Sequence, residues 1–419
     1  MSEVILTMDK IQLIFFFISG FAVSRLMIKA RLPHRIVYWF IGKRHLSIAK
    51  ILFYLIAISA VLSFFIPNAI TVLTLLPLLE LLRRSFEESN GPSKNIATML
   101  ALSTIYGANI GGMGSITATP ANGILITYAV LNDIPGIQQL SFASWLVWGI
   151  PLVIIFVCIA GLIISVVLRP WRHQQYNIQL PFDAEKTFHP FQKITVWMTV
   201  FYFLSSFVLS LLMMYFPGQT VLILYVSGIL TLLFVLILFF LPVKVDPQTD
   251  SRQVLLTLAD CYNELPTRGF LFVGIAVVLA AILYAFGIHE FFAGWAASIV
   301  STDLSVLALF FLIALATSFS TEVLSNTAVQ LSFFVMALPL AQTLGFSALE
   351  MLIIVTLSRT SAFMSPIATG VNGLAFGGVK DVSFSKMLVV GFIMNLAGAG
   401  LISNWVLFVV GRLYGLVQN

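Results

Sequence analysis

Small groups of polar residues interrupt the long apolar stretches of this 419-residue sequence. Pro67-Asn68-Ala69 lies inside one such stretch, Ser325-Asn326-Thr327 inside another, and Arg359 inside a third. Amide and hydroxyl oxygens are hard ligands that suit an alkali cation, and a guanidinium can hold an anion through two parallel hydrogen bonds. Because an ionisable residue within a membrane is a functional candidate by default, these residues favour the binding of small ions.

Arg359 leaves three roles open. It lies well inside the apolar run that begins near Phe346, where an arginine costs a few kcal/mol or more unless it is paired. It could clamp an anion or stand in for one bound cation. It could also be a structural partner of Glu322 or of the carbonyls of the adjacent loop.

Patterns that would indicate an enzyme do not occur. The sequence contains no HExxH, GxSxG or P-loop motif. Its two cysteines suggest neither a disulfide framework nor a metal site. The five histidines fall in loops or interfaces, and no aspartate falls inside an apolar run. A membrane enzyme or a receptor-like scaffold therefore lacks both a catalytic constellation and a sizeable soluble domain, and we expect no catalytic residues.

The composition requires a membrane. Charged residues make up 9% of the chain, hydrophobic residues 59%, and the mean hydropathy is +1.02. Apolar runs of about 20 residues can cross the hydrocarbon core as helices. Six ordinary spans are predicted at 11–30, 143–168, 191–216, 219–242, 269–288 and 385–411. The first lacks the features of a signal peptide and should be retained.

Two stretches predict helical hairpins. The 32 residues of the run 51–82 would extend about 48 Å as one helix, too long for one crossing and too short for two. Basic residues flank both of its ends, so we expect a re-entrant hairpin with its tip at Pro67-Asn68-Ala69. The stretch 304–343 carries Ser325-Asn326-Thr327 in the same way, although two full spans there would give the same number of crossings.

Two further stretches predict discontinuous helices. Four glycines and a proline interrupt the run 95–131 between Gly107 and Asn122, so this segment should not be regular helix. The segment from Ser365 to Asn372 interrupts the run 347–378. Non-helical backbone at membrane depth survives only where it lines a polar cavity or is buried in protein.

The same plan occurs twice along the chain. Asn326 follows Asn68 at an offset of 326 − 68 = 258, and the segment 369–372 follows 119–122 at an offset of 369 − 119 = 250. The fold class predicted is an all-α polytopic membrane protein, an inverted repeat with two re-entrant hairpins and two discontinuous transmembrane helices. We expect a shortened first repeat over 1–168, a cytoplasmic loop over 169–190 and a second repeat over 191–419.

The basic residues set the expected orientation. With eight crossings, 19 of the 22 lysines and arginines fall in inside loops, only Lys10 and Arg412 fall outside, and Arg359 is left in the membrane. The net charge of +5 is thus explained by the positive-inside rule rather than by nucleic-acid binding. Both termini are expected outside the inner membrane.

Inverted repeats with broken helices are typical of secondary transporters, whose half-helix N-termini favour anions and whose free carbonyls coordinate cations. The sequence also resembles the divalent-anion/sodium symporter family of the ion transporter superfamily. The segments 321–328 and 361–372 carry this resemblance most specifically, and the segments 67–77 and 107–122 carry it more faintly. It extends over about residues 11–414.

The resemblance implies an elevator-type symporter of small anions, such as mono- or dicarboxylates or sulfate, with Na⁺ as the coupling ion. The substrate candidates are Asn68, Ser325, Asn326, Thr327, Thr369 and Arg359. The sodium candidates are Ser63, Asn68, Ala108 and Gly112 on one side, and Thr321, Asn326 and Ala368 on the other. The alternative for Ser63 and Thr321 is a bond back to a helical carbonyl.

The sequence departs from the family pattern in two further ways. Pro67 and Ala69 replace hydroxyl residues, which removes two donors from the first tip. The family's three leading helices have no counterpart before residue 11, so a homodimer is implied only by the family. A cation/proton antiporter or an oxyanion exporter of the same superfamily is the alternative function.

Overall fold

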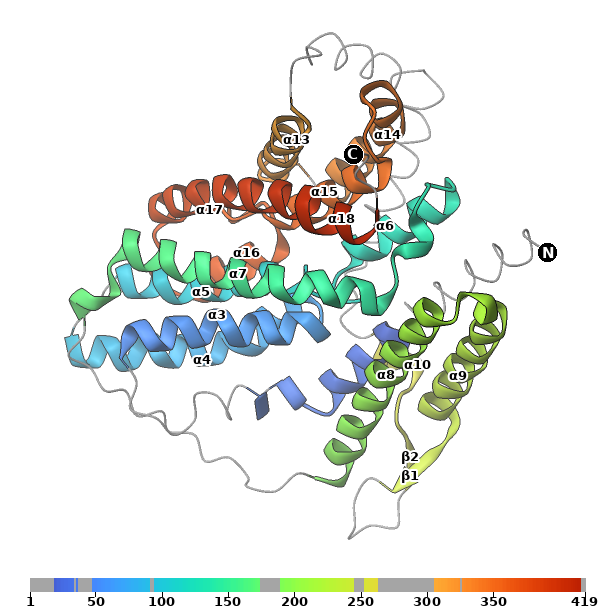
Figure 1. Ribbon diagram of the computed structural model, residues 1–419. Helices are drawn as coiled ribbons and strands as arrows, with labels where there is room; N and C mark the ends of the chain where they lie inside the picture. Colours follow the sequence, from blue (N-terminus) through green and yellow to red (C-terminus); the bar gives the residue numbers. More distant parts are fainter. Residues whose placement is uncertain are drawn as a thin grey trace.

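The computed structural model describes residues 19–33, 35–36, 47–90, 94–173, 189–244, 252–262, 305–324 and 326–415. Helices dominate these segments, and one short two-stranded hairpin accompanies them (Figure 1). A helix over residues 19–29 comes first.

The first group of helices contains a hairpin, a broken helix and a long helix. α3 (Ile48–Phe65) and α4 (Asn68–Asn90) form the hairpin. The break falls at Ile66 and Pro67 because proline has no N–H and disfavours helical backbone in the residue before it; Ile66 is extended. α5 (Lys94–Gly111) and α6 (Pro120–Leu131) form the broken helix, and η1 (Ile137–Gln139) leads into α7 (Phe142–Leu168).

The last group repeats this order. α13 (Val306–Ser320) and α14 (Asn326–Leu344) form the second hairpin, and α15 (Ala348–Thr360) and α16 (Gly370–Gly378) form the second broken helix. The long helix α17 (Phe384–Trp405) continues through the π-helical segment η4 (Val406–Val410) into α18 (Gly411–Leu413). α17 packs against α7, which brings the two groups together (Figure 1).

Between these groups lie two long helices and a small polar cap. After η2 (Pro170–His173), α8 (Pro190–Tyr215) leads through η3 (Pro217–Gln219) to α9 (Thr220–Phe240). β1 (Pro242–Lys244) pairs antiparallel with β2 (Arg252–Val254), and α10 (Leu258–Tyr262) follows. Asp260 of α10 forms a 2.8 Å ion pair with Lys29, which ties this cap to the N-terminal helix.

Five helices of the described segments are long and apolar enough to cross a membrane: α3, α7, α8, α9 and the helix running from α17 through α18. Four of these match the spans predicted at 143–168, 191–216, 219–242 and 385–411. The span predicted at 11–30 is described only from residue 19, and the one at 269–288 lies outside the described residues. The chain is therefore a mostly helical, polytopic membrane protein.

Two sequence-based boundaries were wrong. The first hairpin runs from residue 48 to residue 90 rather than from 51 to 82, and α3 alone is long enough to span, so the length argument for a re-entrant hairpin does not hold. The helix α5 also continues through Gly107 to Gly111. A Cβ at Gly107 would lie 2.3 Å from the Ile56 carbonyl oxygen, and one at Gly111 would lie 2.2 Å from that of Ala60. These two glycines permit close packing on α3 and do not break the helix.

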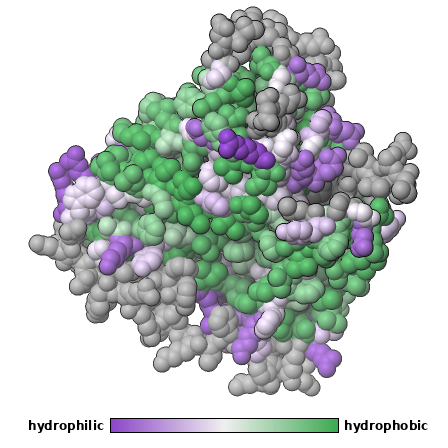
Figure 2. All heavy atoms as spheres, in the orientation of Figure 1, coloured by the Kyte–Doolittle hydropathy of each residue, from purple (hydrophilic) through white to green (hydrophobic). Residues whose placement is uncertain are grey.

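Apolar side chains cover much of the outer surface. Figure 2 shows them over the face that α7 and α17 present in this view. Leu162 of α7 is 64% exposed and Val389 of α17 is 55% exposed. Contiguous apolar surface of this kind is typical of a surface that contacts lipid.

Candidate ion-binding site

The loops of the two broken helices are held by the same hydrogen bonds. The Asn122 side chain donates from Nδ2 to the carbonyl oxygens of Gly112 (3.1 Å) and Ser115 (2.8 Å). The Asn372 side chain donates from Nδ2 to those of Ala362 (2.9 Å) and Ser365 (2.9 Å). Each asparagine lies in the first turn of the second helical arm, so each folds its loop back over the start of that arm.

The two broken helices also contact each other across the molecule. Asn109, near the end of α5, donates to the Asn372 Oδ1 (3.3 Å) and to the Ala362 carbonyl oxygen (3.4 Å). In the other direction α15 packs against α6. Polar groups of both loops therefore meet in the buried centre between the halves.

At the first hairpin tip, three of the sodium candidates come together. Asn68 begins α4, and a Cβ on Gly112 would lie 2.9 Å from its Oδ1, so the Asn68 amide rests directly on the loop after α5. Ala108 is one turn before Gly112 and its carbonyl accepts from the Gly112 N–H at 3.3 Å. Ser63, also buried, donates its hydroxyl to Thr71 Oγ1 at 3.0 Å rather than to a helical carbonyl.

At the second tip, Asn326 begins α14 just as Asn68 begins α4, and Thr327 follows in its first turn. Ser325 lies outside the described residues. Thr321 caps the C-terminal end of α13 and donates its hydroxyl to the Ser318 carbonyl oxygen at 2.7 Å, which is the back-bonding alternative considered from the sequence.

The two tip asparagines share an unusual property. The Oδ1 atoms of Asn68 and Asn326 are buried, and neither accepts a hydrogen bond from the described residues. Most buried polar atoms have a partner, and an exception calls for an explanation such as a bound ion or water. Two acceptor oxygens at equivalent positions of the two hairpins can coordinate cations.

Glu322, at the second tip, ties the hairpin to the neighbouring loop. Its Oε1 accepts from the Met364 N–H (3.0 Å) and its Oε2 from the Ser365 N–H (2.8 Å). Asn395 of α17 donates from Nδ2 to Glu322 Oε1 at 2.7 Å. The loop containing Ala368, which is 8% exposed, is thus fixed to both α13 and α17. The sequence indicates Glu322 only as a possible partner of Arg359, and no pattern in it predicts this role.

Arg359 is buried near the end of α15 and does not pair with Glu322. Its Nη1 donates to Gln330 Oε1 at 2.8 Å, while its Nε finds no acceptor among the described residues. Gln330 in turn donates from Nε2 to the carbonyl oxygen of Ala121 at 2.9 Å and to Thr356 Oγ1 at 3.0 Å. Gln330 is in the second turn of α14 and Ala121 is in the first turn of α6. Gln330 therefore links the guanidinium to the N-terminal parts of α14 and α6, and helix N-termini favour anions.

Thr369 is the remaining candidate. Its Oγ1 accepts from the Asn372 N–H at 3.0 Å and donates to Asn372 Oδ1 at 2.9 Å, which makes it the N-cap of α16. Its hydroxyl is therefore engaged within the loop.

The long helix of each group supports the adjacent loop through a glycine. A Cβ on Gly149 of α7 would lie 2.7 Å from the Gly114 carbonyl oxygen, and Trp145 donates from Nε1 to the Met113 carbonyl oxygen at 2.9 Å. A Cβ on Gly391 of α17 would lie 2.4 Å from both the Met364 Cα and the Phe363 carbonyl oxygen.

The substitution Gly391→Ala should lower the free energy of unfolding by about 1 to 3 kcal/mol, because the methyl group meets backbone that must shift. Gly400→Ala, in the same helix, is the matched control, since its nearest neighbour would be a side-chain atom of Phe311 at 4.0 Å. Denaturant unfolding of the two purified variants measures the difference. Equal stability of the two variants would mean that the close approach of α17 to the loop is not formed.

Over nearly its whole length the chain matches a known family. A family model described as the sodium:sulfate symporter transmembrane region matches residues 6–417. The chain belongs to this family, which confirms the family resemblance that the sequence motifs indicated. It is accordingly a membrane transporter and not an enzyme.

The individual relatives share only about a quarter of their residues with this chain. The sodium-dependent dicarboxylate transporter SdcS of Staphylococcus saprophyticus is 24% identical, over 96% of this chain and 78% of the relative. The protein of the same name from Staphylococcus aureus (strain NCTC 8325 / PS 47) is 25% identical, over 97% and 78%. The solved structure of the Alcanivorax borkumensis YdaH transporter, described as having an unusual topology, covers 94% of this chain and 85% of its own with a TM-score of 0.57 at 14% identity. That likeness shows a related fold alone.

Proposed function

We propose that this protein is a sodium-coupled secondary transporter of small anions. The observation that carries the proposal is the pair of unpartnered, buried Oδ1 atoms of Asn68 and Asn326, one on each hairpin tip. Sodium-dependent dicarboxylate transporters among its relatives support the same coupling ion and a carboxylate substrate. The family description also supports sulfate.

Each hairpin tip and its adjacent loop would hold one sodium ion. On the first side the ligands would be Asn68, Ser63 and carbonyl oxygens around Ala108 and Gly112. On the second side they would be Asn326, Thr321 and the carbonyls around Ala368. The hydroxyls of Ser63 and Thr321 each donate their hydrogen elsewhere, and a hydroxyl that does so keeps lone pairs free for a cation.

The anion would bind between the two sodium sites. Amide and hydroxyl groups of Asn68, Ser325, Asn326 and Thr327 would contact it, and Arg359 would supply a positive charge. Thr369 contributes least among the candidates, because its hydroxyl is engaged with Asn372. An anion at this place would be attracted by helix dipoles, by the guanidinium and by the bound sodium ions.

Transport would follow an elevator mechanism within an inverted repeat. Residues 1–168 and 191–419 would be the two repeats, joined by the loop 169–190, with re-entrant hairpins entering from opposite faces of the inner membrane and both termini outside. The equivalent hydrogen bonds of Asn122 and Asn372 support the repeat. The hairpins and broken helices would move together against α8 and α9.

Sodium binding should be visible as thermal stabilisation. The melting temperature of the purified protein is expected to rise with sodium chloride and not with potassium or choline chloride, because the tip oxygens form a small site for a hard cation. At a sodium concentration 100 times the Kd, the stabilisation amounts to about 2.7 kcal/mol. A melting temperature that does not change with sodium would contradict sodium coupling. Coupling to protons, or exchange of one anion for another, would then be the alternative.

Replacement of Arg359 by lysine tests the anion site. Arg359→Lys should weaken anion binding by about 1 to 3 kcal/mol through loss of the planar fork, while sodium stabilisation is kept. Isothermal titration with a dicarboxylate and with sulfate measures the change.

The matched variant is Gln330→Met, which removes the acceptor of Arg359 but keeps its charge. If Arg359 only joins α14 to α6, both variants should lower stability with strong coupling in a double-mutant cycle, and neither should alter anion affinity. That outcome would assign anion binding to the hairpin tips alone.

A further inference from the structure

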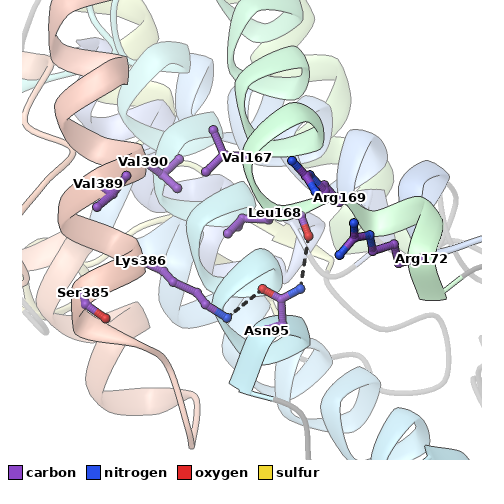
Figure 3. Close-up of a pocket in the computed structure, with 9 residues that line it drawn as sticks. All are labelled: Asn95, Val167, Leu168, Arg169, Arg172, Ser385, Lys386, Val389 and Val390. Atoms are coloured by element: carbon purple, nitrogen blue, oxygen red, sulfur yellow. Dashed lines mark hydrogen bonds between the residues drawn. The ribbon is translucent and has the colours of Figure 1, made fainter.

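A second group of charged side chains lies away from the hairpin tips, in a pocket of about 640 Å³ where α7 ends and α17 begins (Figure 3). Arg169 and Arg172, at the end of α7 and in η2, line one side of it, and Lys386 of α17 lines the other. Asn95, at the start of α5, lies between them. Two segments that are distant in the sequence, 169–172 and the start of α17, thus bring three cations to one cavity.

Hydrogen bonds fix the centre of this basic pocket. Lys386 donates from Nζ to Asn95 Oδ1 at 3.0 Å, and Asn95 donates from Nδ2 to the Leu168 carbonyl oxygen at 3.1 Å. Arg169 caps the C-terminal end of α7 in the left-handed conformation, with φ 51° and ψ 61°. This conformation is uncommon for a residue with a Cβ, and it turns the chain sharply, so that Arg169 and Arg172 remain at the pocket.

The described residues around the basic pocket supply no compensating negative charge. Among the residues that the structure describes, no aspartate or glutamate lines it. Within the segments that the structure describes, no carboxylate lies within ion-pair distance of Arg169, Arg172 or Lys386. Three like charges around one cavity create a strong positive potential, which an anion would complement.

The walls of the basic pocket are apolar and lead along the membrane-spanning helices. Val167 of α7 and Val389 and Val390 of α17 line it. On α17, Val389, Phe392 and Leu396 follow at helical spacing on one face and are 55%, 46% and 37% exposed. This exposed apolar face begins at the cations and continues toward the middle of a helix long enough to span the bilayer.

We propose that the basic pocket binds the headgroup phosphate of an anionic phospholipid, with an acyl chain lying along the Val389 face of α17. Cations at the end of a membrane-spanning helix, next to lipid-facing apolar surface, match both parts of such a lipid. A free inorganic anion would use the cations and leave the apolar wall without a role. Since α7 and α17 support the two central loops, the bound lipid would join the ends of these supporting helices.

The test is lipid titration of the purified full-length chain in detergent, followed by its melting temperature. Dioleoyl phosphatidylglycerol is expected to stabilise at concentrations at least about tenfold lower than dioleoyl phosphatidylcholine. The triple variant Arg169→Gln, Arg172→Gln, Lys386→Gln should lose this preference, because each basic residue near a membrane surface contributes a factor of about five. If the triple variant fails to fold, Arg172→Gln alone should weaken the preference about fivefold.

The matched control is Lys50→Gln, Lys193→Gln, Lys380→Gln, which removes the same charge from exposed positions outside the pocket. It should retain the preference for phosphatidylglycerol. The proposal is overturned if the two lipids stabilise equally or if both triple variants lose the preference alike. It is also overturned if inorganic phosphate stabilises the unmodified chain but not the triple variant, since the pocket would then be a site for a free anion.

Discussion

Asn68→Ala and Asn326→Ala are each expected to abolish sodium-driven anion uptake in proteoliposomes while leaving the sodium-free protein as stable as the unmodified chain. The buried Oδ1 atoms of both residues accept no hydrogen bond within the described structure, so their removal breaks no acceptor contact there. Each is instead proposed to give a cation one of its few protein ligands. Loss of the sodium-dependent rise in melting temperature should accompany the loss of uptake.

The matched control is Asn122→Ala. Its side chain donates two hydrogen bonds to the loop 112–119, so this variant should lower the stability of the sodium-free protein by about 1 to 3 kcal/mol. The assignment of the tip asparagines to ion binding fails if their variants lose the same stability as Asn122→Ala, or if they transport with unchanged sodium dependence.

The substitution Glu322→Gln should lower the free energy of unfolding by about 2 to 5 kcal/mol, the largest loss among the substitutions predicted here. The carboxylate accepts from two backbone N–H groups and from Asn395. A glutamine would turn an NH₂ group toward at least one of these donors, leaving buried N–H groups without an acceptor. Because the same loop is proposed to coordinate sodium, the sodium concentration at half-maximal uptake should also rise. Denaturant unfolding and sodium-dependent uptake measure the two effects.

Glu350→Gln provides the comparison. Glu350 is 2% exposed against 6% for Glu322, but its Oε1 has no partner within the described residues. Within that part of the chain the carboxylate has only a backbone hydrogen bond at Ser347. Removing its charge should therefore change stability by less than about 1 kcal/mol or raise it, since a buried charge without an ion pair is costly. If the two variants behaved alike, Glu322 would have no special role in holding the loop.

Local chemistry explains what could be predicted from the sequence. Proline at position 67 and the glycines and polar residues from 107 to 122 disfavour a helix, so breaks in both runs were predicted, but the second break begins after Gly111 rather than at Gly107. The equivalence of Asn122 and Asn372 was also visible, because both stand at the same place in an interrupted apolar run. The structure adds that both make the same two kinds of hydrogen bond.

Long-range contacts explain what could not be predicted. The bond from the Met364 N–H to Glu322 joins residues 42 positions apart, and no pattern near Glu322 indicates it.

The extension of α4 to residue 90 was missed because its last turns are polar. Arg83 pairs there with Glu80 and Glu87 at helical spacing. The pairing of β1 with β2 was also missed, although Val243 and Val254 flank a stretch of mostly polar sequence.

The crossed contacts of the two broken helices have a consequence for how such a chain can evolve. Arg359 and Asn109 occupy equivalent places, since 359 − 109 = 250 is also the offset between Asn372 and Asn122. Two identical half-length subunits would have to carry the same residue at both places, and each additional buried guanidinium would cost free energy unless it were paired. Within one polypeptide each position can mutate alone, so an amide can bridge the halves on one side while a cation is kept on the other. A single polypeptide therefore permits an asymmetry between its two broken helices that a symmetric pair of subunits could not acquire.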